Sequence, residues 1–375
     1  MLAVRTRIFF QPRALRCYRS VSTLPPLPPR EEWKSLFPSS QNQGRVFLQN
    51  EQTADRIAEG ILTGPDGREY EGEPKVIIES FPGPGALTRS LTKLPPSKVK
   101  KIIVLEDVDR FRDYVKPLEE YDSRVTVVPL SGYTWSTYPE IEALGLLKDV
   151  ITREWADEIP NLHFVSHIPH TVLGDQLLAQ LWRIIPERSW LFKYGRVPMS
   201  FILSELLHER VVAAPGVTKY NKLSVIASAT SEIRDIVPAE DLKPYPDHFW
   251  PTGGRGHGHR ITGTPFVAIN VFPTIESCIQ PGLIDKWDYV LRRLFVLKST
   301  KLDKAINSLG PGANHLLRVI ADPSKPKSEQ LDLTKTIRRL TLDDFKVIVK
   351  AFDEWPFAPE DLGIRDPIYK NVERD

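Results

Sequence analysis

The stretch Glu79-Ser80-Phe81-Pro82-Gly83-Pro84-Gly85-Ala86-Leu87-Thr88 decides how this chain folds. It follows a short apolar run at 75–79 (KVIIE), which predicts a buried strand, and it leads into a helical pattern at 86–94. Glycines let a backbone approach a ligand closely, and the first amides of the following helix point toward the same place. The stretch therefore predicts a ligand-binding turn between a strand and a helix.

Acidic residues end the next predicted strand, which covers 101–106 (KIIVLE) and is followed by Asp107. In the nucleotide sites of open α/β sheets, a carboxylate at this place accepts hydrogen bonds from the two hydroxyls of a ribose. A glycine-rich loop with an acid at the end of the neighbouring strand predicts a nucleoside-cofactor site. The alternative is a tight strand-to-helix turn beside a solvated acid.

Strands and helices alternate along the first 280 residues. Further strands are predicted at 124–130, 162–166, 190–194 and 266–272, and helices at 50–62, 173–184 and 201–212. This alternation predicts an α/β fold with a doubly wound parallel sheet. Beyond it the patterns are helical, at 285–297, 303–309 and 342–355, which predicts a small all-α C-terminal domain. The predicted regions are therefore 1–30, 31–278 and 279–375.

The first 30 residues differ from the rest in composition. They contain no acidic residue, and five of their arginines lie among apolar side chains: Arg5, Arg7, Arg13, Arg16 and Arg19. Such a segment predicts a mitochondrial presequence, followed by a proline-rich linker at 24–29. The alternative is a basic tail that touches nucleic acid.

The overall composition argues against several classes of protein. The sequence has no apolar run long enough to predict a transmembrane helix. A net charge of +2 fits a local basic patch. Cys17 and Cys278 are too few and too far apart for a disulfide scaffold or a cysteine zinc site. His257 and His259 lie in a glycine-rich stretch that predicts a surface loop, so no metal site is expected.

Taken with its neighbours, the stretch at 79–88 resembles the first methyltransferase motif of the rRNA adenine N6,N6-dimethyltransferase family, E-x-G-P-G-x-G-x-L-T. Further segments resemble that family at Gly44–Leu48, Asp107–Arg110, Glu209–Gly216, Tyr220–Val225 and Arg338–Phe345. The resemblance covers most of the chain and implies a Rossmann-like class I methyltransferase fold. Mitochondrial transcription factor B proteins form a branch of the same family, and the predicted presequence points toward that branch.

The cofactor that the resemblance implies is S-adenosyl-L-methionine. Its contacts would fall on Leu48, Glu79, Phe81, Gly83, Gly85 and, at the ribose, Asp107. The chain departs from the family pattern here: Phe81 replaces the first motif glycine, Arg45 replaces a glutamine, and no acid follows the third strand. A benzyl group at position 81 is expected to fill space that the methionine part of the cofactor needs.

The family's N-L-P-Y motif is replaced by His167-Ile168-Pro169-His170, so the catalytic positions fall on His167, Pro169 and His170. Methylation of an adenine amino group needs a flipped base. The family's asparagine binds that amino group, and an aromatic ring stacks on the base. His170 retains a ring for stacking, and a neutral His167 can accept one hydrogen bond. The alternative is that both are loop residues on a scaffold that has lost its chemistry, so the resemblance leaves methyl transfer open.

Basic residues recur along the predicted C-terminal helices. Lysines and arginines that line a groove bind phosphates, and aromatic residues between them stack on unpaired bases. The predicted nucleic-acid contacts are Arg292, Arg293, Lys298, Lys301, Arg338 and Arg339. The alternative is amphipathic helices with solvated basic faces.

These features and the resemblance lead to two main functional hypotheses. In the first, the protein is a transcription initiation factor of the mitochondrial matrix. It binds promoter DNA and joins a mitochondrial RNA polymerase. It does not associate with a membrane, and it is monomeric outside that complex. In the alternative, it is an S-adenosyl-L-methionine-dependent N6,N6-dimethyltransferase of the mitochondrial small-subunit rRNA; a third hypothesis is an assembly factor that binds rRNA. A pocket filled by Phe81 and the loop at 131–133 favours the first hypothesis.

Overall fold

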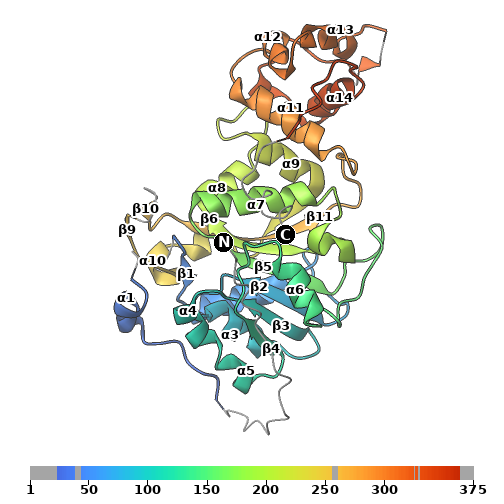
Figure 1. Ribbon diagram of the computed structural model, residues 1–375. Helices are drawn as coiled ribbons and strands as arrows, with labels where there is room; N and C mark the ends of the chain where they lie inside the picture. Colours follow the sequence, from blue (N-terminus) through green and yellow to red (C-terminus); the bar gives the residue numbers. More distant parts are fainter. Residues whose placement is uncertain (1–22, 39–43, 256–260, 325, 328–329, 364–375) are drawn as a thin grey trace, which may run out of the picture.

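A seven-stranded sheet forms the centre of the structure, a computed structural model that describes residues 23–38, 44–255, 261–324, 326–327 and 330–363 (Figure 1). The strand order is β4-β3-β2-β5-β6-β11-β7. From β4 to β6 the strands pair in parallel, whereas β11 is antiparallel to both β6 and β7. The strands are β2 (Lys75–Ser80), β3 (Val99–Leu105), β4 (Val125–Val128), β5 (Leu162–His167), β6 (Met199–Ser204), β7 (Ser231–Asp235) and β11 (Phe266–Pro273).

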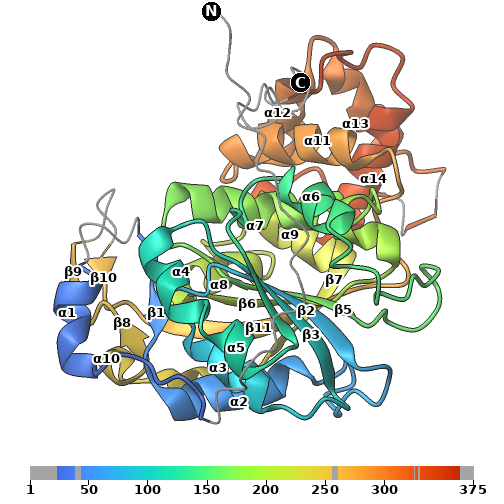
Figure 2. The same ribbon diagram turned by 60° about the horizontal axis from the view of Figure 1, so that its bottom comes forward.

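The parallel strands are buried throughout because helices cover both faces of the sheet. Every residue of β2, β5 and β6 is buried, as expected for strands with two covered faces. One face packs on α2 (Glu51–Ile61) and α3 (Ala86–Lys93), and the other on α7 (Val172–Ile184) and α9 (Lys222–Thr230) (Figure 2). The predicted doubly wound α/β fold is confirmed, although the antiparallel β11 makes the sheet mixed rather than wholly parallel.

Shorter elements complete this region. The remaining helices are α4 (Asp109–Val115), α5 (Leu118–Tyr121), α6 (Thr137–Ala143), α8 (Glu205–Val211), α10 (Tyr245–His248) and the 3-10 turn Ala239–Leu242. Two small antiparallel pairs lie outside the main sheet. They join β1 (Phe47–Leu48) to β8 (Phe249–Trp250), and β9 (Gly254–Arg255) to β10 (Ile261–Thr262).

The predicted strand at 190–194 is wrong. Trp190–Tyr194 forms a 3-10 helix, and the strand that pairs with β5 is β6. Arg188 and Trp190 both have positive φ angles, 51° and 56°. L-residues seldom adopt this conformation, and it interrupts an extended run.

The predicted helix at 201–212 begins later than expected, at Glu205. Ser204 caps it, because its side chain accepts a hydrogen bond from the backbone N–H of Leu207. A short apolar run such as 201–203 fits a strand and a helix equally well. Pairing with β5 and β11 on its two sides makes it a strand.

Among the described residues beyond position 283, the regular elements are helical, as predicted. They are α11 (Ile284–Val296), α12 (Leu302–Ala305), α13 (Leu316–Ile320) and α14 (Leu342–Asp353), with 3-10 turns at Ile306–Leu309, Ala313–His315 and Ile337–Arg339. The division at residue 279 stays a prediction, because buried residues of these helices and of the α/β region form one continuous cluster. No helix in the part of the chain that the structure describes is long and apolar enough to cross a membrane.

An N-terminal strap, residues 23–38, packs against the α/β region. Arg89 of α3 holds it, since Nε donates to the carbonyl of Pro25 at 2.7 Å and Nη2 to that of Pro26 at 3.3 Å. Trp33 of α1 (Trp33–Leu36) and Phe37 are buried beside Phe47 and Phe111. The predicted linker at 24–29 is therefore docked on the fold, and the presequence predicted before it falls at positions 1–22, outside the described residues.

We expect Trp33→Phe to lower the free energy of unfolding by about 1–2 kcal/mol, because it removes a hydrogen bond and part of a buried ring. The indole Nε1 donates to the carbonyl of Pro28 at 2.9 Å, and the ring packs edge-on against Phe37 at 5.3 Å. Chemical denaturation measures the loss. The exposed neighbour variant Lys34→Ala is the control, and equal effects of the two variants would contradict the docking of the strap.

Candidate functional site

The loop that follows β2 has the backbone of a ligand-binding turn. Phe81, Gly83 and Gly85 have φ angles of 59°, 60° and 83°. A Cβ at Gly83 would come within 2.1 Å of the Phe47 ring, and one at Gly85 within 2.4 Å of Val115, so both positions need glycine. Phe81 adopts the same left-handed conformation with a side chain, at a cost of about 1–3 kcal/mol.

The Phe81 ring lies inside this site and is only 8% exposed. Its centroid is 5.5 Å from the guanidinium of Arg45. On another side is Gly132, where a Cβ would lie 3.6 Å from the ring. The ring therefore occupies space between the loop after β2 and the loop after β4.

A buried ion pair occupies the end of β3. Arg45 donates to both carboxylate oxygens of Glu106, at 2.8 and 2.5 Å, and the two side chains are 5% and 0% exposed. The backbone N–H of Val108 also donates to Glu106, at 3.0 Å. The guanidinium lies 4.7 Å from the ring of Phe111 and 5.6 Å from that of Phe47. Bidentate charge-assisted bonds and aromatic neighbours hold this arginine in one geometry.

Glu106 directly follows the last residue of β3 and is buried, whereas Asp107, the predicted ribose contact, is exposed. The ribose contact at Asp107 stays a prediction. The predicted cofactor contact Leu48 belongs to an apolar cluster with Ala54 and Ile57 of α2. Sequence reasoning missed the partner of Arg45, although an arginine in place of glutamine beside an acidic strand end was the available signal.

Glu79 at the end of β2 is fully buried. Burial raises the pKa of its carboxyl to about 7, although the Thr88 hydroxyl, which donates to Glu79 Oε2 at 2.7 Å, acts in the opposite direction. The nearby Glu106 raises this pKa further. Glu79, the acid of the motif, therefore accepts a hydrogen bond from α3, the helix that follows the glycine loop.

The loop after β4 carries no carboxylate. Residues 129–136 contain no acid, and Tyr138 donates to the carbonyl of Gly132 at 2.8 Å. A Cβ at Gly132 would lie 2.4 Å from Ser80, so the loop packs directly on the end of β2. The loop after β4 therefore has no acid that could bind an adenine, and it is closely packed against β2.

His167 is the last residue of β5 and is buried. Burial, and then the nearby Arg45 guanidinium, lower the pKa of its imidazole to about 3. Its Nε2 has no hydrogen-bond partner among the described residues. The ring is therefore neutral near pH 7, which removes the repulsion of a sulfonium that a charged histidine would cause.

The rest of the predicted catalytic segment forms a tight turn. The backbone N–H of His170 donates to the carbonyl of Gly44 at 2.8 Å, and the ring packs edge-on against Phe266 with centroids 5.8 Å apart. A Cβ at Gly174 would lie 1.9 Å from the carbonyl oxygen of Pro169, so the turn fits closely against α7. Because His170 is buried, it presents little surface for stacking on a base in this conformation.

Stability is expected to depend on pH through His167. Its pKa in the folded protein lies below the ordinary value of about 6.5. Unfolding therefore takes up a proton below pH 6.5, and stability falls by about 1.4 kcal/mol per pH unit as pH decreases toward 3. His167→Asn should reduce the slope between pH 6 and 4.5 by about one proton, as measured by denaturation at several pH values. The matched control is His315→Asn, at an exposed histidine, and an unchanged slope in His167→Asn would contradict a buried neutral imidazole.

S-adenosyl-L-methionine does not fit the residues present. Glu106, the buried acid at the end of β3, is bound by Arg45, and the Phe81 ring lies in the loop where the family has glycine. Side chains of the protein itself thus occupy places where the resemblance puts parts of the cofactor.

Most of the predicted nucleic-acid contacts carry unbalanced positive charge. Arg292 pairs with Asp288 at 3.8 Å. None of the other five forms an ion pair with a carboxylate within the described parts of the chain: Arg293, Lys298, Lys301, Arg338 and Arg339. Four of these five side chains are exposed, and Arg338 is half-buried. Such charges are available to phosphates.

The basic residues meet the α/β region at the loop 214–219. Lys298 Nζ donates to the carbonyl of Thr218 at 3.4 Å, and the backbone N–H of Gly216 donates to the carbonyl of Arg338 at 2.6 Å. Lys222 of α9 pairs with Asp288 of α11 at 2.5 Å. These contacts join the charged helices to the sheet beside α8 and α9.

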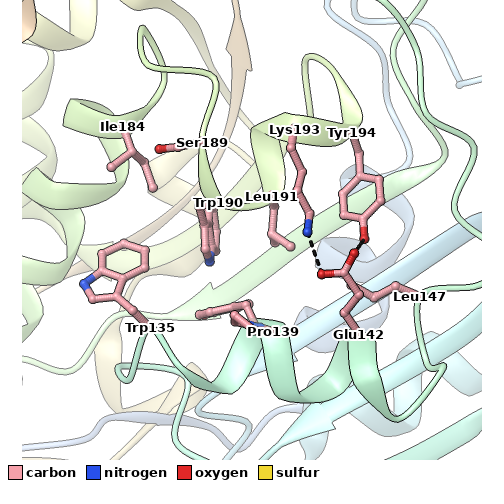
Figure 3. A pocket seen from close by; sticks show the side chains of 11 residues that line it. Trp135, Pro139, Glu142, Leu147, Ile184, Ser189, Trp190, Leu191, Lys193 and Tyr194 are labelled. Carbon is pink, nitrogen blue, oxygen red and sulfur yellow. Dashed lines mark hydrogen bonds and ion pairs between the residues drawn. The ribbon is translucent and has the colours of Figure 1, made fainter. Parts of the chain in front are cut away.

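A separate cavity of about 340 Å³ lies between α6 and the 3-10 helix at 190–194 (Figure 3). Trp135, Tyr138 and Trp190 form much of its wall. Lys193 and Tyr194 both donate to Glu142 at one end, at 2.5 and 2.8 Å, and lower the pKa of its carboxyl. Sequence reasoning missed this cavity, because its residues come from segments far apart in the chain.

No cluster of three metal-binding side chains occurs among the residues described. His257 and His259, the histidines of the glycine-rich stretch, lie outside those residues.

The strand order and the glycine loop at the end of β2 define a protein of the Rossmann-like methyltransferase class. The profile of a family described as ribosomal RNA adenine dimethylase matches residues 39–343. The chain belongs to that family, as its resemblance at 79–88 predicted.

Named relatives fall into two groups. Mitochondrial transcription factor 1 of Lachancea kluyveri is 26% identical over 305 residues, which cover 78% of this chain and 84% of that protein. Mitochondrial dimethyladenosine transferase 1 of Homo sapiens is 26% identical over 351 residues, which cover 89% of this chain and 87% of that protein. The crystal structure of a dimethyladenosine transferase from Plasmodium falciparum aligns with a TM-score of 0.50 at 17% identity, covering 81% of this chain and 96% of that one.

Proposed function

We propose that this protein is a mitochondrial transcription initiation factor that binds promoter DNA, assists a mitochondrial RNA polymerase and does not transfer methyl groups. The observation that carries the proposal is the buried ion pair of Arg45 and Glu106 at the end of β3, next to the predicted ribose contact Asp107. Similarity to proteins named mitochondrial transcription factor 1 supports the transcriptional role. The arginine-rich segment at 1–30 supports import into the matrix.

Cofactor binding would have to break strong interactions that the protein already makes. Separating a buried ion pair costs about 3–5 kcal/mol when one charge is left without its partner. The Phe81 ring would also have to leave a site in which the residue is only 8% exposed. A transcription factor that does not use the cofactor needs neither change.

The unpaired basic residues support the nucleic-acid part of the proposal. Lys298, Lys301 and Arg339 are exposed and lack carboxylate partners among the described residues. Lys298 contacts the loop 214–219, and Arg339 directly follows Arg338, whose carbonyl accepts a hydrogen bond from Gly216 of that loop. Polymerase and DNA are the partners of this surface in the proposal, and the free protein is monomeric.

The second candidate is a mitochondrial rRNA adenine N6,N6-dimethyltransferase. It is favoured by the glycine loop at Gly83 and Gly85, which keeps its left-handed backbone, and by relatives named dimethyladenosine transferase. It requires a ribose acid, a base-binding acid after β4 and a base-binding side chain at position 167. In this chain Arg45 already binds the buried acid Glu106, residues 129–136 contain no acid that could bind the base, and position 167 carries a histidine.

Two measurements on the purified protein separate these candidates. Calorimetric titration with S-adenosyl-L-methionine should detect no binding, while run-off transcription from a promoter template with purified mitochondrial polymerase should increase when the protein is added. The double variant Arg45→Gln/Phe81→Gly, which restores the family residues, should gain cofactor binding. Micromolar cofactor binding by the unaltered protein, together with methylation of small-subunit rRNA, would instead establish the second candidate.

A further inference from the structure

The cavity between α6 and the 3-10 helix at 190–194 has the size and the walls of a small-molecule site. Its volume of about 340 Å³ lies at the lower end of the range for ligand pockets, roughly 300–1,000 Å³. Such a space holds about ten non-hydrogen atoms, if each is given the ~30 Å³ that one water occupies in the liquid. Much of its wall is apolar or aromatic: Trp135, Tyr138, Pro139, Leu147, Ile184 and Trp190.

Trp190 gives this cavity a hydrogen-bond donor that the protein does not use. Its ring packs edge-on against Trp135 and Tyr138, with centroids 5.9 and 4.8 Å apart. The indole Nε1 is buried and has no hydrogen-bond partner within the part of the chain that the structure describes. In Figure 3 this nitrogen points from the 3-10 helix toward α6, across the cavity. Buried N–H groups without a partner are rare in folded proteins, so we expect an acceptor to complete the site.

The turn that carries Trp190 is held in a strained conformation. Arg188 and Trp190, on either side of Ser189, have φ angles of 51° and 56°. The guanidinium of Arg188 lies 4.9 Å from the centroid of the Trp155 ring, and this contact holds the turn in place. Residues in sparsely populated backbone conformations cluster at sites that bind ligands. The strain therefore supports a binding role for the indole.

The charges at one end of the cavity cancel each other. Lys193 and Tyr194 both donate to the carboxylate of Glu142, and the three side chains lie together in Figure 3. An anionic ligand at this end would meet the carboxylate of Glu142, and a cationic ligand would meet the ammonium of Lys193. The site therefore favours a neutral occupant.

We propose that this cavity binds a neutral, planar aromatic molecule of about ten non-hydrogen atoms that carries a hydrogen-bond acceptor. A flat ring stacks on an indole or meets it edge-on, and the acceptor receives the hydrogen bond from Trp190 Nε1. A purely aliphatic occupant would leave this donor unpaired. A nucleotide would bring phosphates to a wall whose lysine is already paired. The proposal goes beyond the proposed function and does not depend on it.

The test uses quinoline and naphthalene, two flat bicyclic probes of similar shape, of which only quinoline has an acceptor nitrogen. Fluorine NMR follows the purified protein, labelled with fluorotryptophan, as each probe is added, and single Trp→Phe variants assign the signals. We expect quinoline to bind with a Kd on the order of 0.1 mM. It should shift the signals of Trp135 and Trp190 and leave those of Trp33 and Trp250, which pack beside the N-terminal strap, unchanged.

Two variants test the contacts, with the Trp135 signal as the reporter. Trp190→Phe keeps a ring but loses the donor, so the affinity for quinoline should fall about fivefold to tenfold and that for naphthalene less than about twofold. Ser189→Phe, at an exposed residue of the wall, fills the cavity and should weaken both probes more than about tenfold. Ser123→Phe, at an exposed serine outside the cavity, is the matched control.

Other results would overturn the inference. Absence of quinoline binding, or equal shifts of all four tryptophan signals, would show that the cavity is not such a site. Equal losses for the two probes in Trp190→Phe would show that Nε1 binds no acceptor. Displacement of quinoline by added mitochondrial polymerase would assign the cavity to a protein segment instead. None of these results affects the proposed function, which the transcription assay tests separately.

Discussion

Replacing Lys298, Lys301 and Arg339 together with glutamate is expected to weaken binding to nucleic acid about 100-fold at moderate salt. All three side chains are exposed, and none has a carboxylate partner in the described part of the chain, so their charge is free to act on phosphates. Each phosphate contact releases condensed counterions, so the logarithm of the affinity falls linearly with the logarithm of the salt concentration. Removing three contacts should therefore also reduce that slope by about three.

The measurement is a set of anisotropy titrations at several salt concentrations, with unaltered protein alongside. Lys34→Glu, which reverses an exposed charge on the N-terminal strap, is the matched control. Circular dichroism confirms that the triple variant is folded. A change of less than threefold in affinity, with an unchanged salt slope, would mean that these residues are solvated and that the nucleic acid binds elsewhere.

Breaking the ion pair of Arg45 and Glu106 on one side is expected to lower the free energy of unfolding by about 3–5 kcal/mol. In Arg45→Met, the Glu106 carboxylate stays buried beside the backbone N–H of Val108 and loses both guanidinium bonds. An unpaired charge in such a place is far less stable than the same group in water. The loss comes from this leftover charge rather than from the attraction of the pair.

A double variant tests that explanation. In Arg45→Met/Glu106→Gln both charges are gone, while the new amide can still accept the hydrogen bond from Val108. We expect it to recover most of the lost stability, to within about 2 kcal/mol of the unaltered protein. Chemical denaturation of the unaltered protein, Arg45→Met, Glu106→Gln and the double variant gives the coupling energy directly. Arg112→Met, which breaks the exposed pair with Asp109, should cost no more than about 1 kcal/mol and serves as the control.

Additive losses in this cycle would contradict the argument, because they would mean that the two charges do not depend on each other. The result also bears on evolution of the site within the family. If the pair is as strongly coupled as its geometry indicates, a return to cofactor binding needs more than a glycine at position 81. Arg45 must be replaced as well, which is why the double variant in the calorimetric test changes both residues.

Several parts of the fold could be predicted because neighbouring residues decide them. The run at 75–79 is buried and β-forming, Gly83 and Gly85 permit a left-handed turn, and Pro95 and Pro96 end the helix that follows. The structure has a strand, a loop and a helix in these places. Phe81 was singled out from its position in the motif, whereas the residues that its ring meets, Arg45 and Gly132, come from distant parts of the chain.

Errors arose where more than one conformation suited the local pattern. Trp190–Tyr194 is apolar enough for a strand but forms a 3-10 helix, with positive φ angles at Arg188 and at Trp190 itself. The two acids at the end of β3 also differ in a way that the sequence does not reveal. Successive side chains of an extended backbone point to opposite sides, and here Glu106 is buried while Asp107 is exposed.

The order of neighbouring residues was thus enough to predict the glycine loop, the alternation of strands and helices, the C-terminal helices and the family. These features depend on backbone preferences and apolar periods over a few residues. The state of the cofactor site depends instead on Arg45 and Glu106, which are 61 positions apart in the chain. The ion pair between Asp175 of α7 and Arg210 of α8 likewise joins residues that are 35 positions apart. Whether a side chain forms an ion pair or stays exposed depends on contacts between segments that are distant in the sequence. Folding of the whole sheet brings those segments together.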